Sequence, residues 1–169
     1  MNNEINNGIN IDIEICRDGV KLPFYANPGD AGMDVCAAAE VVIAPGETKI
    51  VPTGLKVAIP EGFEIQVRPR SGVSYKTPLR IPNSPGTIDS GYRDEIGIIM
   101  TNSSCPCCSV EGVFDLDTKG NKKGTYIVKK NDRIAQIVLA PVYKISYNLV
   151  SDVKLIGEDR GGGFGSTGV

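Results

Sequence analysis

The sequence contains no histidine. Serine and cysteine triads that need imidazole are therefore excluded, as are metal sites built on histidine, and any general base must be a carboxylate. The chain also lacks an apolar run of roughly 18 to 20 residues, the length of a membrane span, and it has no apolar leader between Met1 and Ile15. Together with five cysteines, an odd number, these absences predict a reduced, cytoplasmic protein without membrane contact.

The charge balance argues against a duplex DNA-binding protein. The formal net charge is -2, so we expect no stable nucleic-acid binding. Guanidinium groups nevertheless bind phosphate in a bidentate way, and a few of them can outweigh a mild global charge. Five arginines stand in short Gly-rich or Pro-rich blocks: Arg68, Arg70, Arg93, Arg133 and Arg160. Taken singly, each is better explained by a surface ion pair.

Turn residues separate short apolar runs along the whole chain. The 20 Gly and 11 Pro lie between these runs, and 63–68 alternates with a period of two. Runs 48–51 and 55–59 resemble a strand pair broken at 52–54. A short helix is expected after Ser71, ended by Pro78. Further strands are expected at 9–16, 41–44, 95–101, 125–128 and 134–142. The pattern predicts an all-β sandwich, jelly roll or barrel.

Two segments differ from the rest. Residues 103–124 form a long polar, Cys-bearing and Lys-rich excursion between two strands. From Gly157 onward the chain is Gly-rich, and such a tail cannot bury enough surface to order itself until something binds it. The expected division is therefore a domain at 1–156, carrying an insert at about 103–124, followed by a flexible Gly-rich C-terminal arm at 157–169.

Five short blocks carry residues suited to chemistry, although each alone has an ordinary structural explanation. They are AGMDV at 31–35, RPRSG at 68–72, GTIDSGYRD at 86–94, DRIAQ at 132–136 and RGGGFGSTG at 160–168. The structural explanations are, in order, an Asx-type turn, a strand end with a helix cap, a hairpin with a turn Asp and a core Tyr, a strand entry, and a disordered tail. The last block is not a phosphate loop of the Walker type, because no Gly-Lys-Ser/Thr closes it.

In this order, the five blocks resemble the five motifs of the trimeric dUTPase family, and the resemblance runs from about Pro28 to the C-terminus. It implies a jelly-roll-like β-barrel assembled as a homotrimer with shared active sites. The implied activity is hydrolysis of dUTP to dUMP and pyrophosphate with Mg²⁺ as cofactor. That reaction keeps uracil out of DNA and supplies dUMP for thymidylate synthesis.

The resemblance also implies roles for single residues. Asp89 would deprotonate the water that attacks the α-phosphorus, as a chain without histidine requires. Tyr92 would pack under the deoxyribose and exclude a ribose 2′-hydroxyl. The edge of uracil would be read by a group of neighbouring positions, so that cytosine and thymine are rejected. These positions are Asn83, Gly86, Thr87, Ile88 and Gly97.

The phosphates and the metal would be held elsewhere. Arg70, Ser71, Gly72 and Gln136 would hold the phosphates, and Asp34 would face Mg²⁺ through water, since this ion usually keeps part of its shell. In the arm, Phe164 would stack on the base. The outer phosphates would be gripped by Arg160, Gly165, Ser166 and Thr167.

Some features depart from the family pattern and leave rival functions to weigh. Asp94 stands where the family commonly has Gly. The insert is longer than usual and holds Cys105, Cys107 and Cys108, which could bind zinc, lie in a plain surface loop, or accompany a site for a protein partner or regulator. The related dCTP deaminase needs a Glu as proton shuttle where this chain has Ile99, which cannot move a proton.

Overall fold

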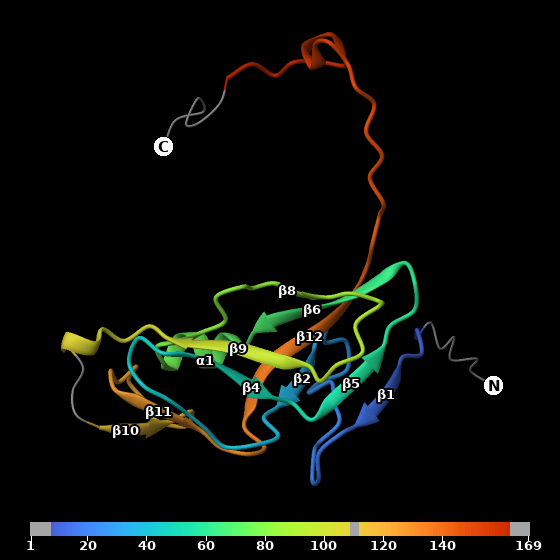
Figure 1. Ribbon diagram of the computed structural model, residues 1–169. Coiled ribbons are helices and arrows are strands. Elements are labelled where there is room, and N and C mark those ends of the chain that lie inside the picture. The colour runs from blue at the N-terminus through green and yellow to red at the C-terminus, as the bar shows by residue number, and fades with distance from the viewer. Residues whose placement is uncertain (1–7, 109–111, 163–169) are drawn as a thin grey trace.

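The computed structural model describes residues 8–108 and 112–162, where twelve strands form four small sheets (Figure 1). The strands are β1 (Asp12–Ile15), β2 (Met33–Cys36), β3 (Val41–Ile43), β4 (Thr48–Pro52), β5 (Leu55–Ala58), β6 (Phe63–Pro69), β7 (Leu79–Arg80), β8 (Gly86–Ile88), β9 (Gly97–Asn102), β10 (Val113–Asp115), β11 (Thr125–Val128) and β12 (Arg133–Pro141). The sheets have the orders β2-β12-β6-β8, β4-β9-β7, β10-β11-β3 and β1-β5. The fold is mostly β and jelly-roll-like, as expected, but the sheets do not close into a barrel.

The core lies between the inner faces of these sheets and follows from the period-two pattern. In β9, Ile98, Met100 and Asn102 are buried, while the alternate residues are half-exposed. Asn102 is a buried polar residue, and its side-chain amide donates to the carbonyls of Ile43 (3.0 Å) and Gly124 (2.8 Å). These two bonds satisfy the amide and fix the start and end of the insert against β3.

The short helix is α1 (Ser71–Lys76), which ends as the sequence predicts. Thr77 caps it: both its backbone N–H and its hydroxyl donate to the Val73 carbonyl, at 3.1 and 2.7 Å. Two 3-10 turns, η1 (Pro106–Cys108) and η2 (Val153–Leu155), complete the helical content of the described residues. In these two stretches of chain no helix is long and apolar enough to cross a membrane.

Two expected strand pairings are wrong. β4 pairs with β9 and β5 pairs with β1, so the turn at 52–54 joins two different sheets and does not close a hairpin. Likewise β8 pairs with β6, whereas β9 pairs with β4 and β7. The hairpin expected at 86–94 is therefore not formed, because β8 and β9 do not pair with each other. The reason in both cases is that the partner strand comes from a distant part of the sequence, which local turn chemistry cannot reveal.

The insert contains more structure than the surface loop considered from the sequence. Its strand β10 runs parallel to β11, which follows it after nine residues, and the Phe114 ring lies 5.8 Å from that of Tyr126. A three-residue strand is too short to show a period, so the sequence gives no signal for it.

The C-terminal segment leaves the sheets at the end of β12, as Figure 1 shows. The last strand ends at Pro141, well before the arm boundary expected at Gly157. The side chains of Tyr147 and Leu149 are 85% and 101% exposed, so they make almost no contact within this chain. The exposed segment thus carries apolar residues that an isolated chain does not bury.

Candidate active site

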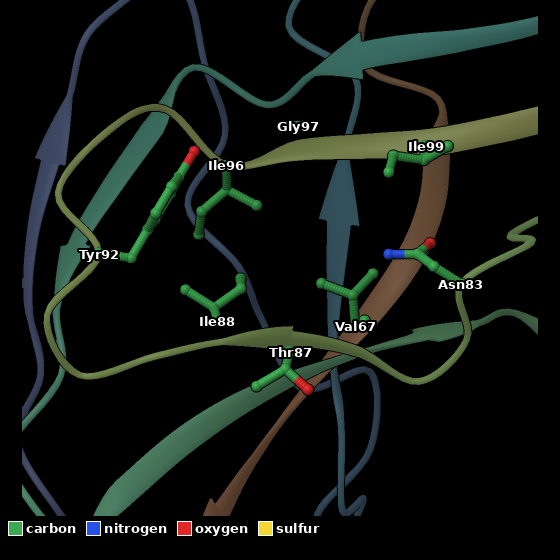
Figure 2. A pocket seen from close by; sticks show the side chains of 9 residues that line it. Val67, Asn83, Thr87, Ile88, Tyr92, Ile96, Gly97 and Ile99 are labelled. Carbon is green, nitrogen blue, oxygen red and sulfur yellow. The ribbon is translucent and has the colours of Figure 1, made fainter.

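A slot of about 210 Å³ opens between β8 and β9 (Figure 2). It exists because these two strands, although consecutive, do not pair. The side of β8 away from β6 has no strand partner among the described residues, and β7 pairs with β9 only at Thr101 and Asn102. Ligand pockets typically run from roughly 300 Å³ upward. The slot therefore has room for a compact ring system but not for a long charged ligand.

Asn83 and Tyr92 stand at opposite ends of this slot (Figure 2). Gly86 lies against Asn83, because a Cβ at Gly86 would come within 3.0 Å of the Asn83 amide nitrogen. The slot is further lined by Thr87, Ile88 and Gly97, as the resemblance implies, and by Val67, Ile96 and Ile99, which sequence reasoning did not assign to it. Val67 and Ile99 are ordinary apolar residues of β6 and β9, and Ile96 directly precedes β9, so nothing in the sequence marks them beyond their apolar character.

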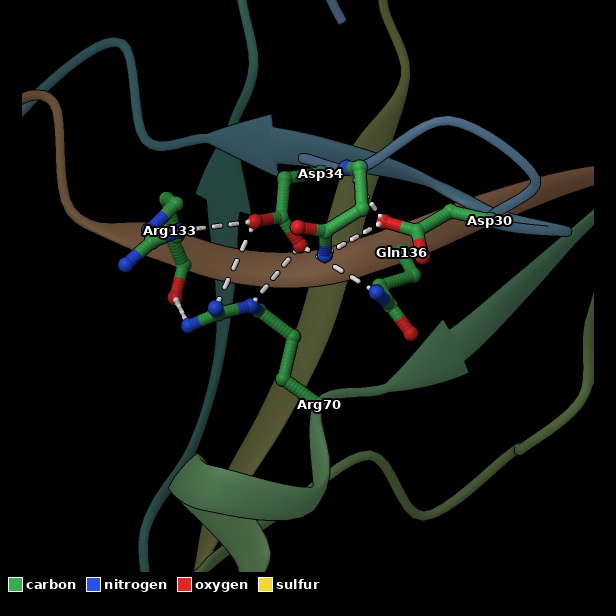
Figure 3. Close-up of polar contacts among 6 residues, drawn as sticks. Asp30, Asp34, Arg70, Arg133 and Gln136 are labelled. Atoms are coloured by element: carbon green, nitrogen blue, oxygen red, sulfur yellow. Dashed lines mark hydrogen bonds and ion pairs between the residues drawn. The ribbon is translucent and has the colours of Figure 1, made fainter. Parts of the chain in front are cut away.

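A second concavity is cationic and gathers around Asp34 (Figure 3). Asp34 lies within β2 and is 2% exposed, so it is not the turn residue considered from the sequence. The carboxylate in the preceding turn is that of Asp30, which accepts a hydrogen bond from the Asn27 N–H at 2.8 Å. The charged and amide residues that line this concavity are Asn27, Asp30, Asp34, Arg68, Arg70, Arg133 and Gln136.

Both oxygens of the Asp34 carboxylate accept hydrogen bonds. Arg70 donates through Nε to Oδ1 at 2.9 Å and through Nη2 to Oδ2 at 3.3 Å. Arg133 Nη1 reaches Oδ2 at 3.1 Å, and Gln136 Nε2 reaches Oδ1 at 3.3 Å. A buried carboxylate so placed orients both guanidinium groups and the amide toward one surface. Two guanidinium groups and an amide held in this way suit the binding of an anion.

The same contacts test whether Asp34 could hold Mg²⁺ directly. A hard cation needs oxygen ligands whose lone pairs are available, and two guanidinium charges beside those oxygens oppose it. Direct coordination by Asp34 does not fit this arrangement. Among the side chains described within 8–108 and 112–162 there is also no cluster of three Cys, Asp or Glu suited to a metal ion. The zinc site considered for the insert includes Cys108, whose side chain lies outside the described ones.

Asp89 lies in neither concavity. It lines a third hollow with Glu61, Arg93 and Lys144, where the C-terminal segment leaves the body. Arg93 fixes the bend after Asp89, because its Nη1 donates to the carbonyls of Ser90 (2.6 Å) and Tyr92 (2.7 Å). Asp89 is exposed at this bend and free to meet a group brought from outside the chain.

The slot and the cationic concavity lie on opposite faces of one sheet. Val67 and Arg68 are neighbours on β6, and alternation sends Val67 to the slot and Arg68 to the concavity. On β12 their partners Ile137 and Gln136 follow the same division, since Ile137 is buried and Gln136 lines the concavity. One small ligand therefore cannot touch both regions of a single chain.

The remaining residues singled out from the sequence lie apart from these regions. Ser71 and Gly72 begin α1 directly after Arg70, and Arg160 is exposed on the C-terminal segment. Phe164, Gly165, Ser166 and Thr167 lie outside the described residues. Asp132 is a turn residue: its carboxylate accepts from the Lys129 N–H at 2.7 Å, and burial raises its pKa above the usual range.

Comparisons with known proteins agree in pointing to one family. The family described as dUTPase matches residues 18–111. The deoxyuridine 5'-triphosphate nucleotidohydrolases of Alkaliphilus metalliredigens and Clostridioides difficile are each 40% identical over 160 residues, covering 95% and 94% of this chain and 98% of each relative.

Solved structures of phage dUTPases are also similar. The dUTPase of Staphylococcus bacteriophage 80alpha with dUpNHpp superposes with a TM-score of 0.82 at 30% identity, covering 95% of this chain and 99% of its own. A variant of the dUTPase from phage phi11 of S. aureus, described with a structural Mg(II) ion, has a TM-score of 0.76 at 30% identity and covers 86% and 99%.

Proposed function

The chain belongs to the dUTPase family and is a dUTP diphosphatase, and from that premise we propose that it hydrolyses dUTP at sites completed between subunits. The observation that carries the proposal is the slot between β8 and β9, with Asn83 at one end and Tyr92 at the other. Its volume suits a base with its sugar. The triphosphate must then lie outside it, against a cationic surface.

Uracil would be read in the slot by backbone and amide groups. Strand edges without a partner offer N–H and C=O groups in a fixed row, and Asn83 adds an amide that both donates and accepts. Cytosine has the reversed donor and acceptor pattern on the same edge, so it would leave these groups unpaired, which costs free energy in a closed site. The 5-methyl group of thymine would meet the slot walls.

The sugar would lie against Tyr92. The ring forms one end of the slot and is held there by a hydrogen bond from its hydroxyl to the Glu95 carbonyl at 2.9 Å. A ribose 2′-hydroxyl pressed against the ring would lose its hydration without gaining a partner. This is the physical basis for preferring deoxyuridine over uridine nucleotides.

The phosphates would be bound at the cationic concavity of another subunit. Arg70, Arg133 and Gln136 are all oriented there by Asp34, and preorganised donors stabilise developing negative charge without reorganising. Mg²⁺ bound to the triphosphate would supply further charge neutralisation. Because Asp34 does not fit as a direct ligand, its contact with that ion is proposed through water only.

Asp89 would be the base. The chain has no histidine, and among the residues proposed for the site Asp89 is a carboxylate whose hollow also presents Arg93 and Lys144 to an anion. A carboxylate oriented toward water can accept the proton as the water attacks the α-phosphorus, and pyrophosphate then leaves. Removing that proton makes the water a better nucleophile.

A homotrimer would bring these regions together. The slot and the cationic concavity lie on opposite faces of one sheet, so a ligand that contacts both needs the concavity of a second subunit. The exposed segment after β12 could bind that second subunit. Apolar residues alternate there with polar ones, as Tyr143, Ile145, Tyr147 and Leu149 show, which is the pattern of a strand with one buried face. Residues 157–169 would then close over a neighbour's site.

The two rival functions weighed from the sequence have weaker support. The slot has no carboxylate among its described lining residues, and Ile99 stands in its wall, so a dCTP deaminase lacks its proton shuttle there. A regulator that binds through the insert would have the outer edge of β10 to pair with, where Val113 is exposed. Such binding need not exclude hydrolysis.

A pyrophosphate-release assay with dUTP, dTTP, dCTP and UTP tests the activity. We expect release from dUTP alone and its loss in EDTA. Turnover of UTP comparable to that of dUTP would remove the sugar-excluding role of Tyr92, and turnover of none of the four would remove the proposal as a whole.

A further inference from the structure

Three segments far apart in the sequence meet beside Tyr92, outside the slot. Arg17 follows β1, Gly54 lies between β4 and β5, and Glu95 precedes β9. The Arg17 guanidinium grips the Glu95 carboxylate with two hydrogen bonds, from Nε to Oε1 at 2.6 Å and from Nη2 to Oε2 at 2.7 Å. The Gly54 backbone N–H donates to Oε1 at 2.7 Å. Three donors on two other segments thus hold one carboxylate.

The Gly54 anchor has little freedom to move. Its φ is +70°, and a Cβ there would run into the side chains of Val20, Ala38 and Arg17, so glycine is required. Its carbonyl accepts from the Cys16 backbone N–H at 2.9 Å, which ties the Arg17 segment to the same turn. The support for Glu95 is therefore built into the meeting of two sheets.

The main chain of Glu95 holds the Tyr92 ring. The Tyr92 hydroxyl donates to the Glu95 carbonyl at 2.9 Å, and the Tyr92 backbone N–H donates to the Asp89 carbonyl at 3.0 Å. The far end of the ring is thus fixed by Glu95 and its base by the preceding bend. A displacement of Glu95 moves the hydroxyl anchor and tilts the ring away from the end of the slot.

The ion pair stays charged under ordinary conditions. The hydrogen bonds from Arg17 hold the pKa of Glu95 below its usual range, and those to Glu95 raise the pKa of Arg17. The Arg17 side chain is 47% exposed, so replacing it leaves no cavity in the core. The Arg17–Glu95 pair therefore contributes a fixed position for Glu95 and little buried surface.

We propose that Arg17 and Glu95 are positioning residues that hold the Tyr92 ring at the sugar end of the slot and so set the preference for deoxyribose over ribose nucleotides. The inference rests on the proposed function, because it assigns a sugar to the Tyr92 end. Neither residue touches the slot itself. Both act through the position of Tyr92.

The experiment compares kcat/KM for dUTP and for UTP in the full-length protein, in Arg17→Gln and in Glu95→Gln. We expect the ratio of the two values to fall by about tenfold in Arg17→Gln, through a gain with UTP and a higher KM for dUTP, since rejecting one added hydroxyl depends on a closely fitted wall. Lys129→Gln is the matched control, because it removes a 2.6 Å ion pair with Asp115 in another sheet. Its ratio should not change.

Two further variants separate positioning from general stability. Tyr92→Phe removes the hydroxyl anchor and keeps the ring, so it should reproduce the loss of preference, and adding Arg17→Gln to it should bring little more. Arg17→Lys keeps the positive charge but cannot make both guanidinium hydrogen bonds, so it should recover part of the preference for dUTP over UTP. Each variant is also melted, because a lower melting temperature with an unchanged ratio means that the pair serves folding alone.

Failure of the positioning role and failure of dUTP hydrolysis give different results. A wild-type protein that does not hydrolyse dUTP overturns the proposed function. A wild-type protein that prefers dUTP, with Arg17→Gln and Glu95→Gln keeping that preference within about twofold, overturns the positioning role and leaves the function standing.

Discussion

Arg70 holds the buried carboxylate of Asp34 through two nitrogens, Nε at 2.9 Å from Oδ1 and Nη2 at 3.3 Å from Oδ2. Since Arg133 and Gln136 of β12 reach the same carboxylate, one side chain orients donors from β12 and from the start of α1. Asp34 is therefore better placed to organise an anion site than to act as a ligand on its own. This relationship leads to the first prediction.

Asp34→Asn should weaken both stability and phosphate binding. The two arginines would lose a buried counter-charge, but both are partly exposed to solvent, so we expect a cost of about 1 to 3 kcal/mol. Denaturant unfolding and KM for dUTP measure the two effects. Asp30 lines the same concavity but accepts its hydrogen bonds from Asn27 and not from an arginine, so Asp30→Asn should change neither quantity by a comparable amount. Equal effects in both variants would contradict the organising role.

Gly86→Ala should disturb the base end of the slot. The added methyl group would lie 3.0 Å from the Asn83 amide nitrogen and push it from its position. A misplaced methyl in a fitted pocket is worth about 1 to 3 kcal/mol, so kcat/KM for dUTP should fall about tenfold or more. Gly91→Ala is the control, since nothing lies within 4 Å of its Cβ. If both variants behave alike, Asn83 does not depend on Gly86.

Asp89→Asn should retain nucleotide binding while kcat falls by roughly 10² to 10⁴, the contribution of a positioned general base. No histidine is present to replace it. Steady-state kinetics and the affinity for a non-hydrolysable dUTP analogue provide the measurements. Asp94→Asn changes a nearby exposed carboxylate at the same bend and should keep its turnover. Near-normal turnover in Asp89→Asn would mean that the water is activated elsewhere.

Leu149→Asp should break the assembly without unfolding the subunit. Leu149 is exposed in the single chain, so a charge there disturbs only what another copy would bury. Sedimentation should show a trimer for the wild type and a smaller species for the variant, which should also lose turnover. Asn148→Asp, on the other side of the alternation, should remain trimeric. A wild-type monomer with full activity would refute shared sites.

Truncation before Arg160 should leave a folded trimer with little turnover. Residues 160–162, the described part of the removed segment, belong to no strand, and the segment would provide a guanidinium for the departing pyrophosphate and a lid over the base. Phe164→Ala should be milder, because stacking on one base is worth about 1 to 3 kcal/mol. Activity and thermal melting decide the matter. Unchanged activity would leave the tail without a role, and a lost melting transition would show that it is needed for folding.

The local structure was largely predictable because it depends on neighbours in sequence. Alternation at 63–68 predicted β6, the strand expected at 95–101 matches β9 to within two residues, and Pro78 correctly marked the end of α1. The order of the five blocks also gave the family, which the comparisons confirm. The strands that were missed, β2, β7 and β10, have four residues or fewer, too short for a period to show.

The sequence by itself determined which residues are present for the chemistry: no histidine, a carboxylate at Asp89, arginines beside glycines, an aromatic at Tyr92. Only the tertiary structure decided where they lie. It paired β8 and β9 with other strands and not with each other, which opened the slot. It also sent Val67 and Arg68 to opposite faces and placed Arg17 against Glu95. These relationships depend on pairing between distant strands, and the free energy that selects a partner comes from burying whole sheet faces, which no local pattern records.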